Sequence, residues 1–331
     1  MAASIIDSRI FQGIFTTDAM RQVWSDENRT QKYLDIECAL AKVQGRLGLI
    51  PQEAADEIVS HCHLDQIDLD LLRQQTERIG YPILGVVSQL NKLCRDKLGE
   101  YCHWGATTQD ITDTATVLQV REALVLVDDE LAAIAQALAK LAREHRLTPI
   151  IGRSNLQQAI PVTFGYKMAG LLSAVLRHRE RIAQLAALMD AMVADHERST
   201  GPWQIEWIVL PEAFCLLAGA LKQMRTVVEG LQVDPVAMRR NIDMTGGLVM
   251  SEAVMMGLGP YIGREYAHDL VYDLCRQSLA ENKPLLDLLE AHPEIKAHVD
   301  RAALARMLDP ANYLGQSGVM VDRVLACMPA N

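Results

Sequence analysis

The feature that most constrains the fold is a sustained heptad pattern of apolar residues in the second quarter of the chain. Its apolar residues recur at alternating steps of three and four, at Val117, Val120, Leu124, Val127, Leu131, Ile134, Leu138 and Leu141. A strand would alternate its apolar residues at every second position, so this spacing predicts one long helix with a single apolar seam. A periodic helix longer than about 25 residues is typical of a helical bundle, a coiled coil or a repeat.

Two later segments carry apolar seams of the same kind, and short polar connections separate the segments. The second seam consists of Phe164, Met168, Leu171, Val175, Ile182, Leu185, Met189 and Met192. The third consists of Leu210, Phe214, Leu217, Leu221, Met224, Val228 and Leu231. Three heptad helices joined in this way are typical of an up-and-down helical bundle.

Runs of β-branched residues that alternate at every second position are scarce, so the predicted fold class is all-α. We expect three helical domains around a long central bundle: an N-terminal helical domain at residues 1–103, a central long-helix bundle at 104–233 and a small C-terminal helical domain at 234–331. Within the first domain the pattern predicts helices over residues 18–47 and 83–97.

Composition and charge exclude several classes of protein. Half of the 331 residues are apolar, which suffices for large cores, and the formal net charge is -10 without any basic stripe, which argues against a nucleic-acid partner. The seven cysteines show no CxxC spacing, so we expect neither a disulfide framework nor a metal site. Nucleotide-binding loops and HExxH are also absent from the sequence, so it does not support a nucleotide-binding loop or a zincin-type zinc site. We further expect a cytoplasmic protein without a secretory segment or a membrane span.

A polar cluster stands at the start of the first heptad helix. It reads His-Trp-Gly-Ala-Thr-Thr-Gln-Asp-Ile-Thr-Asp at residues 103–113. Thr107 and Asp110 have the spacing of a capping box, which predicts a helix that begins near Thr108. The unbonded N–H groups and the positive end of the helix dipole then lie near His103, where an anion can bind. The cluster fits either a plain helix cap or a ligand site.

A second polar cluster, Gly-Arg-Ser-Asn-Leu-Gln-Gln at residues 152–158, precedes the second heptad helix. We expect the Arg153 guanidinium and the N–H groups of that helix to converge on one carboxylate. If the two helix entrances lie at corresponding ends of neighbouring helices, they form a pocket for a polycarboxylate. Proton removal beside a carboxylate creates a doubly negative intermediate, which needs such donors.

The connection before the third heptad helix mixes polar and aromatic residues. His-Glu-Arg at residues 196–198 is followed by Trp203 and Trp207, with Glu206 between the tryptophans. The tryptophans fit core anchors, whereas His196 and Glu206 fit either surface residues or a site.

Four stretches resemble successive landmarks of the fumarase/aspartase superfamily: residues 103–110, 152–165, 196–207 and 241–247. Within it the chain is most similar to 3-carboxy-cis,cis-muconate cycloisomerases, and next to adenylosuccinate lyases. The resemblance implies an all-helical homotetramer around a central bundle, with active sites assembled from several subunits. It also implies addition or elimination across a carbon–carbon bond beside a carboxylate, without metal or organic cofactor.

The resemblance also implies roles for individual residues, with a small polycarboxylate as the substrate. His103 and Thr108 are the candidate catalytic residues. The candidate substrate-binding residues are Thr107, Gln109, Arg153, Ser154, Gln157, Glu206 and Arg240.

The chain departs from the family pattern most clearly at the signature loop Gly-Ser-Ser-x-Met-Pro-x-Lys-x-Asn-Pro, which does not occur in it. In many members this loop carries the serine taken as catalytic base and a substrate-binding lysine. The segment that resembles the helix after the loop, residues 186–198, follows Leu185 directly. We therefore expect a bundle shortened by an internal deletion.

Other departures bear on the substrate. Asn155 and Gln158 stand where relatives often carry a histidine, and neither acts as a general acid near neutral pH. Ile14 and Phe15 replace an Arg-Tyr pair of adenylosuccinate lyases, and Ala253 replaces one of their later arginines. These losses favour a cycloisomerase-like activity. A catalytically impaired or non-catalytic chain and a fumarate-releasing lyase of the adenylosuccinate lyase type remain the alternatives.

Overall fold

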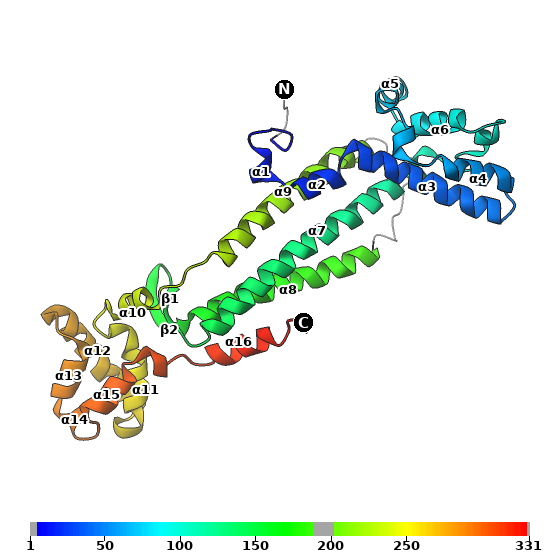
Figure 1. Cartoon of the computed structure of the whole chain (residues 1–331). Coiled ribbons are helices and arrows are strands. Elements are labelled where there is room, and N and C mark those ends of the chain that lie inside the picture. Colours follow the sequence, from blue (N-terminus) through cyan, green and yellow to red (C-terminus); the bar gives the residue numbers. More distant parts are fainter. Residues whose placement is uncertain (1–4, 189–201, 330–331) are drawn as a thin grey trace. The chain divides into compact units, whose positions relative to one another are not determined.

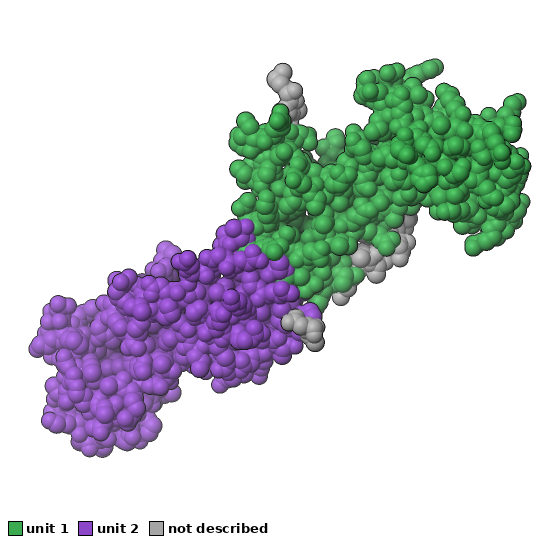
Figure 2. All heavy atoms as spheres, in the orientation of Figure 1, with its two compact units in different colours: residues 1–132, 179–225 green, residues 133–178, 226–331 purple. Residues whose placement is uncertain are grey.

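The computed structural model describes residues 5–188 and 202–329, and these residues are predominantly helical (Figure 1). His196, one of the residues that the sequence singled out, lies outside the described residues, and so does the side chain of Trp203. The packing groups the chain into two units (Figure 2): unit 1 is Met1–Ala132 with Arg179–Arg225, and unit 2 is Ala133–His178 with Thr226–Asn331. The three domain boundaries expected from the sequence stay predictions.

Helices of 4 to 21 residues form the N-terminal part of unit 1. They are α1 (Gln12–Phe15), α2 (Asp18–Val23), α3 (Asp26–Arg46), α4 (Gln52–Ser60), α5 (Leu69–Ile79) and α6 (Pro82–Leu93), with 3-10 turns η1 (Leu64–Gln66) and η2 (Leu98–Tyr101). The expected single helix over residues 18–47 is wrong, because Ser25 interrupts it and caps α3 by accepting a hydrogen bond from the backbone N of Asn28. The helix expected to reach residue 97 ends at Leu93.

The core of this region gathers the inward faces of α3, α4, α5 and α6 around buried side chains such as Tyr33, Leu34, Ile58, Ile83 and Leu90. Gly45 lets α3 and α4 approach closely, since a Cβ there would lie 2.6 Å from the Cβ of Ala55. This packed core supports the residues that enter the first long helix.

The long helices are α7 (Thr108–Glu144), α8 (Phe164–Leu188) and α9 (Pro202–Glu229). The heptad seam of α7 is confirmed, because seven of its eight predicted positions, from Val120 to Leu141, are buried. The buried face of α8 consists of Phe164, Met168, Leu172 and Leu176. The prediction that Leu171 belongs to the apolar seam is wrong, because its side chain is 52% exposed. The buried residues of α8 repeat at steps of four, which moves the face by one position.

Within unit 1, charged pairs hold the long helices together. Arg179 of α8 makes a bidentate ion pair with Asp128 of α7, with Nε–Oδ1 and Nη2–Oδ2 distances of 2.7 and 2.8 Å. Arg225 of α9 reaches Glu130 of α7 at 3.4 Å. The Arg179 hydrogen bonds lower the pKa of Asp128, which keeps this carboxylate charged.

Much of the apolar surface of α9 is uncovered. Leu217 and Met224, two predicted seam positions, are 41% and 52% exposed. By length and composition alone the segment Glu206–Glu229 could cross a membrane, a test that core helices of helical bundles also pass, but only 17% of its most apolar window is buried. Other predicted seam positions are covered, since Val228 is buried and Phe214 is half-buried, so the face is exposed only in part.

The segment expected to lead straight into the second long helix is instead a β-hairpin of strands β1 (Pro149–Ser154) and β2 (Gln157–Thr163). Asn155 and Leu156 form its two-residue turn with φ values of 49° and 63°, both in the left-handed region. A register shift between Ile151 and Arg153 bends the first strand. The all-α class therefore holds with one small hairpin added.

Unit 2 also contains the C-terminal helices α10 (Pro235–Asp243), α11 (Ser251–Ile262), α12 (Arg264–Glu281), α13 (Leu285–Ala291), α14 (Pro293–Lys296), α15 (Arg301–Met307) and α16 (Ser317–Leu325), with 3-10 turns η4 (Leu248–Met250) and η5 (Pro310–Asn312). Asp234 caps α10, as its position before Pro235 suggests. Arg146, after α7, holds α16 through an ion pair with Asp322. The hairpin packs against α10.

Candidate active site

The entry of α7 has the geometry that the sequence predicted. The helix begins at Thr108, and the backbone N of Thr107 donates to Asp110 Oδ2 at 2.9 Å, which is one half of a capping box. Thr107, Thr108 and Gln109 are half-buried, so their side chains lie at the surface of the first turn. This turn presents backbone N–H groups and side-chain donors in one place, which suits a carboxylate.

His103 is anchored by a residue that the sequence analysis missed. Its ring Nδ1 lies 2.6 Å from Glu37 Oε1, and its backbone N donates to Glu37 Oε2 at 3.1 Å. Glu37 belongs to α3 and is 1% exposed. A signal was present in the sequence, because Glu37 shares a helical face with the apolar residues Tyr33, Leu34 and Ala41, and a carboxylate on an inward face needs a partner.

The second group of predicted residues lies on the hairpin. Arg153 and Ser154 end β1 and Gln157 begins β2, and all three are exposed. The expected helix entrance is wrong, because Arg153 lies in a strand and α8 begins only at Phe164. The N–H groups of α8 are therefore not beside Arg153, and any carboxylate there is held by side chains.

Arg240 lies on α10, the helix that packs against β1. The neighbouring Arg239 is neutralised by Asp243 at 3.0 Å and by Asp309 at 3.3 Å. Among the described residues, neither Arg153 nor Arg240 has a carboxylate partner. Gln158 Nε2 donates to the backbone O of Asn241 at 3.3 Å, which ties the hairpin to the helix that carries Arg240. Unit 2 thus offers two uncompensated guanidiniums on adjoining elements, which suits a ligand with more than one carboxylate.

The predicted residues fall into two groups. The group of His103, Thr107, Thr108 and Gln109 belongs to unit 1, and so does the exposed Glu206 on α9. The group of Arg153, Ser154, Gln157 and Arg240 belongs to unit 2. The assignment of these residues to one active site stays a prediction.

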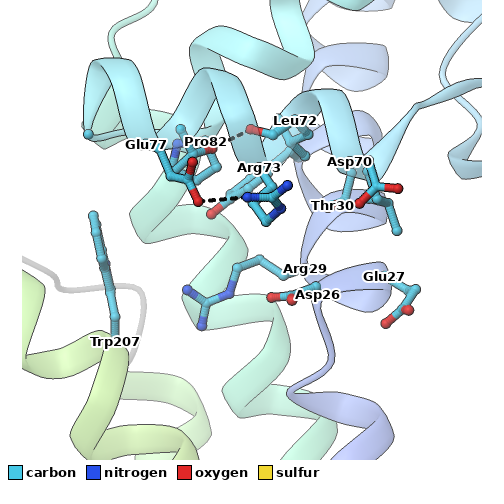
Figure 3. A pocket seen from close by; sticks show the side chains of 14 residues that line it. Asp26, Glu27, Arg29, Thr30, Asp70, Leu72, Arg73, Glu77, Pro82 and Trp207 are labelled. Atoms are coloured by element: carbon cyan, nitrogen blue, oxygen red, sulfur yellow. Dashed lines mark hydrogen bonds and ion pairs between the residues drawn. The ribbon is translucent and has the colours of Figure 1, made fainter.

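A cavity of about 510 Å³ opens in unit 1 between α3, α5 and α9 (Figure 3). Its charged lining residues are Asp26, Glu27, Asp70 and Glu77 with Arg29 and Arg73, and Trp207 forms one wall. Arg73 is already paired with Glu77 at 2.8 Å. Carboxylates outnumber guanidiniums, so this cavity repels a polycarboxylate, and none of the predicted site residues lines it.

The described residues contain no group of three or more His, Cys, Asp and Glu side chains placed to hold a metal ion. Burial raises the pKa of the Cys94 thiol to about 11 and raises that of Cys62 further. These thiols stay protonated near neutral pH, which makes them poor nucleophiles and metal ligands.

Comparison with known proteins places the chain among lyases. A family model described as "Lyase" matches residues 13–195, and one described as "Adenylosuccinate lyase C-terminus" matches residues 247–324. The chain is 40% identical to trans-aconitate decarboxylase 1 of Mycosarcoma maydis, over 95% of this chain and 88% of that protein. It is 31% identical to 3-carboxy-cis,cis-muconate cycloisomerase of Pseudomonas aeruginosa, over 96% of both proteins.

Solved structures show the same fold. The fumarate lyase of Mesorhizobium sp. BNC1 matches with a TM-score of 0.87 and 35% identity, over 94% of this chain and 98% of that one. The 3-carboxy-cis,cis-muconate lactonizing enzyme of Pseudomonas putida matches with a TM-score of 0.89 and 30% identity, over 97% and 99%.

The alignments also bear on the expected internal deletion. The alignment with the decarboxylase extends over 432 positions and that with the cycloisomerase over 441, whereas this chain has 331 residues. More than a hundred positions within each alignment therefore have no residue in this chain. Where the gap lies, and whether the missing segment contains the signature loop, stay predictions.

The lyase family model matches more than half of the chain, and relatives at 31% and 40% identity cover nearly all of it. The chain therefore belongs to the fumarase/aspartase superfamily.

Proposed function

We propose that the chain belongs to a lineage of lyases and cycloisomerases that act on an unsaturated tricarboxylate by proton transfer beside a carboxylate. The compounds named in two of its relatives, trans-aconitate and 3-carboxy-cis,cis-muconate, each carry three carboxylates on a skeleton with a carbon–carbon double bond. Decarboxylation and cycloisomerisation of such compounds share one requirement. A carbanion beside a carboxylate must be stabilised and then protonated.

The observation that carries the proposal is the pair of guanidiniums at Arg153 and Arg240, which lack carboxylate partners among the described residues. In a chain with a formal net charge of -10, arginines left without partners on adjoining elements favour an anionic ligand. The first turn of α7, with Thr107, Thr108 and Gln109, offers donors for a further carboxylate. His103 is the candidate for proton transfer.

The resemblance to the superfamily implies that active sites are assembled from several subunits, so the proposal includes a homo-oligomer in which both groups of residues contribute to the sites. The apolar face of α9 supports this proposal, since Leu217 and Met224 are exposed in the single chain. Light scattering after gel filtration measures the mass of the purified chain. A tetramer is the expected result, and a monomer would contradict the proposed assembly.

The activity is tested by incubating the purified chain with trans-aconitate and, separately, with 3-carboxy-cis,cis-muconate. Carbon dioxide release from the first compound marks a decarboxylase, and loss of the diene absorbance of the second marks a cycloisomerase. Release of fumarate from a succinyl-type substrate instead marks the adenylosuccinate lyase-like alternative. Arg153→Ala should lower kcat/KM at least ten-fold, because a hydrogen bond to a charged group contributes roughly 1.5–3 kcal/mol.

A second candidate function is a chain that binds a polycarboxylate but does not turn it over. The observation that favours it is the alignment gap of more than a hundred positions, together with the absence of the signature loop sequence. Without the loop serine, the family's usual base is missing. A folded tetramer that binds trans-aconitate in calorimetry and yields no product from any of the substrates would establish this alternative.

A further inference from the structure

Glu37 is a buried carboxylate whose oxygens both face the stretch that delivers His103 to the candidate site. We propose that Glu37 is a positioning residue: it holds the His103 ring in the tautomer that carries hydrogen on Nδ1 and leaves Nε2 as the nitrogen that interacts with substrate. The proposal rests on the proposed function of His103. It adds a residue on α3 that the sequence pattern did not assign to the site.

Glu37 accepts hydrogen bonds from two donors and also faces the ring of His103. Oε1 lies 2.6 Å from the ring Nδ1 of His103, and Oε2 lies 3.1 Å from the backbone N of His103 and 3.7 Å from Sγ of Cys102. A carboxylate can only accept hydrogen bonds, so the ring nitrogen that faces it carries the hydrogen. The tautomer follows from this geometry.

The surroundings keep the arrangement in place. Burial, with a contribution from the charge of Glu37, raises the pKa of the Cys102 thiol, so Cys102 remains an S–H donor to the carboxylate. His103 has a φ of 60°, a left-handed conformation that is uncommon for a residue with a side chain. The backbone hydrogen bond to Glu37 helps to hold that conformation, and so sets the direction of the ring.

The other ring nitrogen is available. Among the residues that the structure describes, no group is hydrogen-bonded to Nε2 of His103, and the side chain is 13% exposed. His103 stands a few residues before the first turn of α7, where Thr107, Thr108 and Gln109 lie. An imidazole with one nitrogen held by a buried carboxylate and the other open is the arrangement that proton-transferring histidines use.

Glu37→Gln gives a sharp test because glutamine has one acceptor and one donor in place of two acceptors. The backbone N–H of His103 can only donate, so it takes the amide oxygen. The amide NH₂ group then faces Nδ1, which must become the acceptor. We therefore expect the ring hydrogen to move from Nδ1 to Nε2 in this variant.

The tautomer is read from the ¹⁵N chemical shifts of the imidazole in protein labelled at histidine. Spectra are recorded at the highest pH at which the chain stays folded, and His103→Asn identifies the His103 signals. We expect hydrogen on Nδ1 in the wild type and on Nε2 in Glu37→Gln. Glu57→Gln, which changes a carboxylate 3.4 Å from Nε2 of His61, is the matched control and should leave the His103 signals unchanged.

A wild-type signal with hydrogen on Nε2 would overturn the proposal, and so would a Glu37→Gln spectrum in which the hydrogen stays on Nδ1. The wild-type spectrum decides the matter even if the variant fails to fold. This readout needs no turnover, so an inactive chain would contradict the proposed function and leave the role of Glu37 testable. In an active chain, Glu37→Gln should lower kcat at least ten-fold with little change in KM, and Glu37→Asp should recover part of the loss.

Discussion

Arg239 and Arg240 are neighbours on α10, but their charges have different surroundings. Arg239 is held by Asp243 and Asp309, whereas Arg240 has no carboxylate partner among the described residues. A guanidinium that is already paired gains little from a further anion, whereas an unpaired one gains a charge-assisted hydrogen bond. Mutation of Arg239 is therefore a matched control for mutation of Arg240.

We expect Arg240→Ala to raise the KM for a polycarboxylate about ten-fold, because one charge-assisted hydrogen bond is lost. If the chain does not turn the compound over, its dissociation constant should rise by the same factor. Arg239→Ala should change either quantity less than two-fold. Steady-state kinetics or calorimetry gives both values. Equal effects of the two substitutions would remove Arg240 from the binding site.

Leu156 has a backbone conformation that is unfavourable for a residue with a side chain. It occupies the second position of the hairpin turn with φ at 63° and its side chain is fully exposed. Glycine adopts this conformation without the steric cost that a side chain brings. Leu156→Gly should therefore raise the free energy of unfolding, by up to about 1 kcal/mol, in urea titration. Leu47→Gly, at an exposed position with φ at -85°, is the control and should not stabilise the chain. Destabilisation by Leu156→Gly would mean that the leucine side chain makes stabilising contacts in the assembled protein.

The long helices illustrate how an element is held by its neighbours. Arg179 of α8 and Asp128 of α7 form a bidentate ion pair, and their side chains are 25% and 37% exposed. Its contribution to stability is therefore reduced by solvent, to about 1 kcal/mol. The hydrogen bonds from Arg179 lower the pKa of Asp128 in the folded chain below its unfolded value.

This shift predicts a pH dependence with a definite sign. A carboxyl whose folded pKa is lowered stabilises the fold above its unfolded pKa, near 3.9, and loses that contribution as the pH falls through the folded value. Asp128→Asn should therefore destabilise the chain by about 1 kcal/mol at pH 7. The difference from wild type should narrow as the pH falls below about 4. Asp129→Asn is the control, since Asp129 affects Arg179 through its charge and not through a hydrogen bond. A constant difference across this range would contradict the ion-pair explanation.

Elements also differ in how far the sequence predicted them. The start of α7 at Thr108 and its buried seam were predicted, because capping and heptad spacing are local signals. The hairpin was not predicted, because its turn is Asn-Leu without the glycine that usually marks such turns, and Pro161 interrupts the apolar pattern of β2. The position of Arg153 in a strand followed from that unrecognised turn.

At the scale of the whole molecule, the apolar face of α9 is the surface through which we expect copies of the chain to assemble. Leu217→Glu places a charge on that face, at a position that is 41% exposed in the single chain. If copies of the chain assemble through this face, the substitution should reduce the mass measured by light scattering while the helical circular dichroism signal persists. Gln223→Glu, which adds the same charge at an exposed polar position of the helix, should leave the mass unchanged. An unchanged mass in Leu217→Glu would exclude this face from the assembly.

The sequence by itself determined the helical class, the start and seam of α7 and the resemblance that led to the superfamily. These follow from periodicity, caps and motifs, which operate over a few residues. The tertiary structure alone decided that Glu37 holds His103 across 66 positions of the chain, that Arg239 is neutralised while Arg240 is not, and that part of the predicted seam of α9 is exposed. Pairing between distant residues depends on how helices pack, and a one-dimensional pattern does not encode that packing directly.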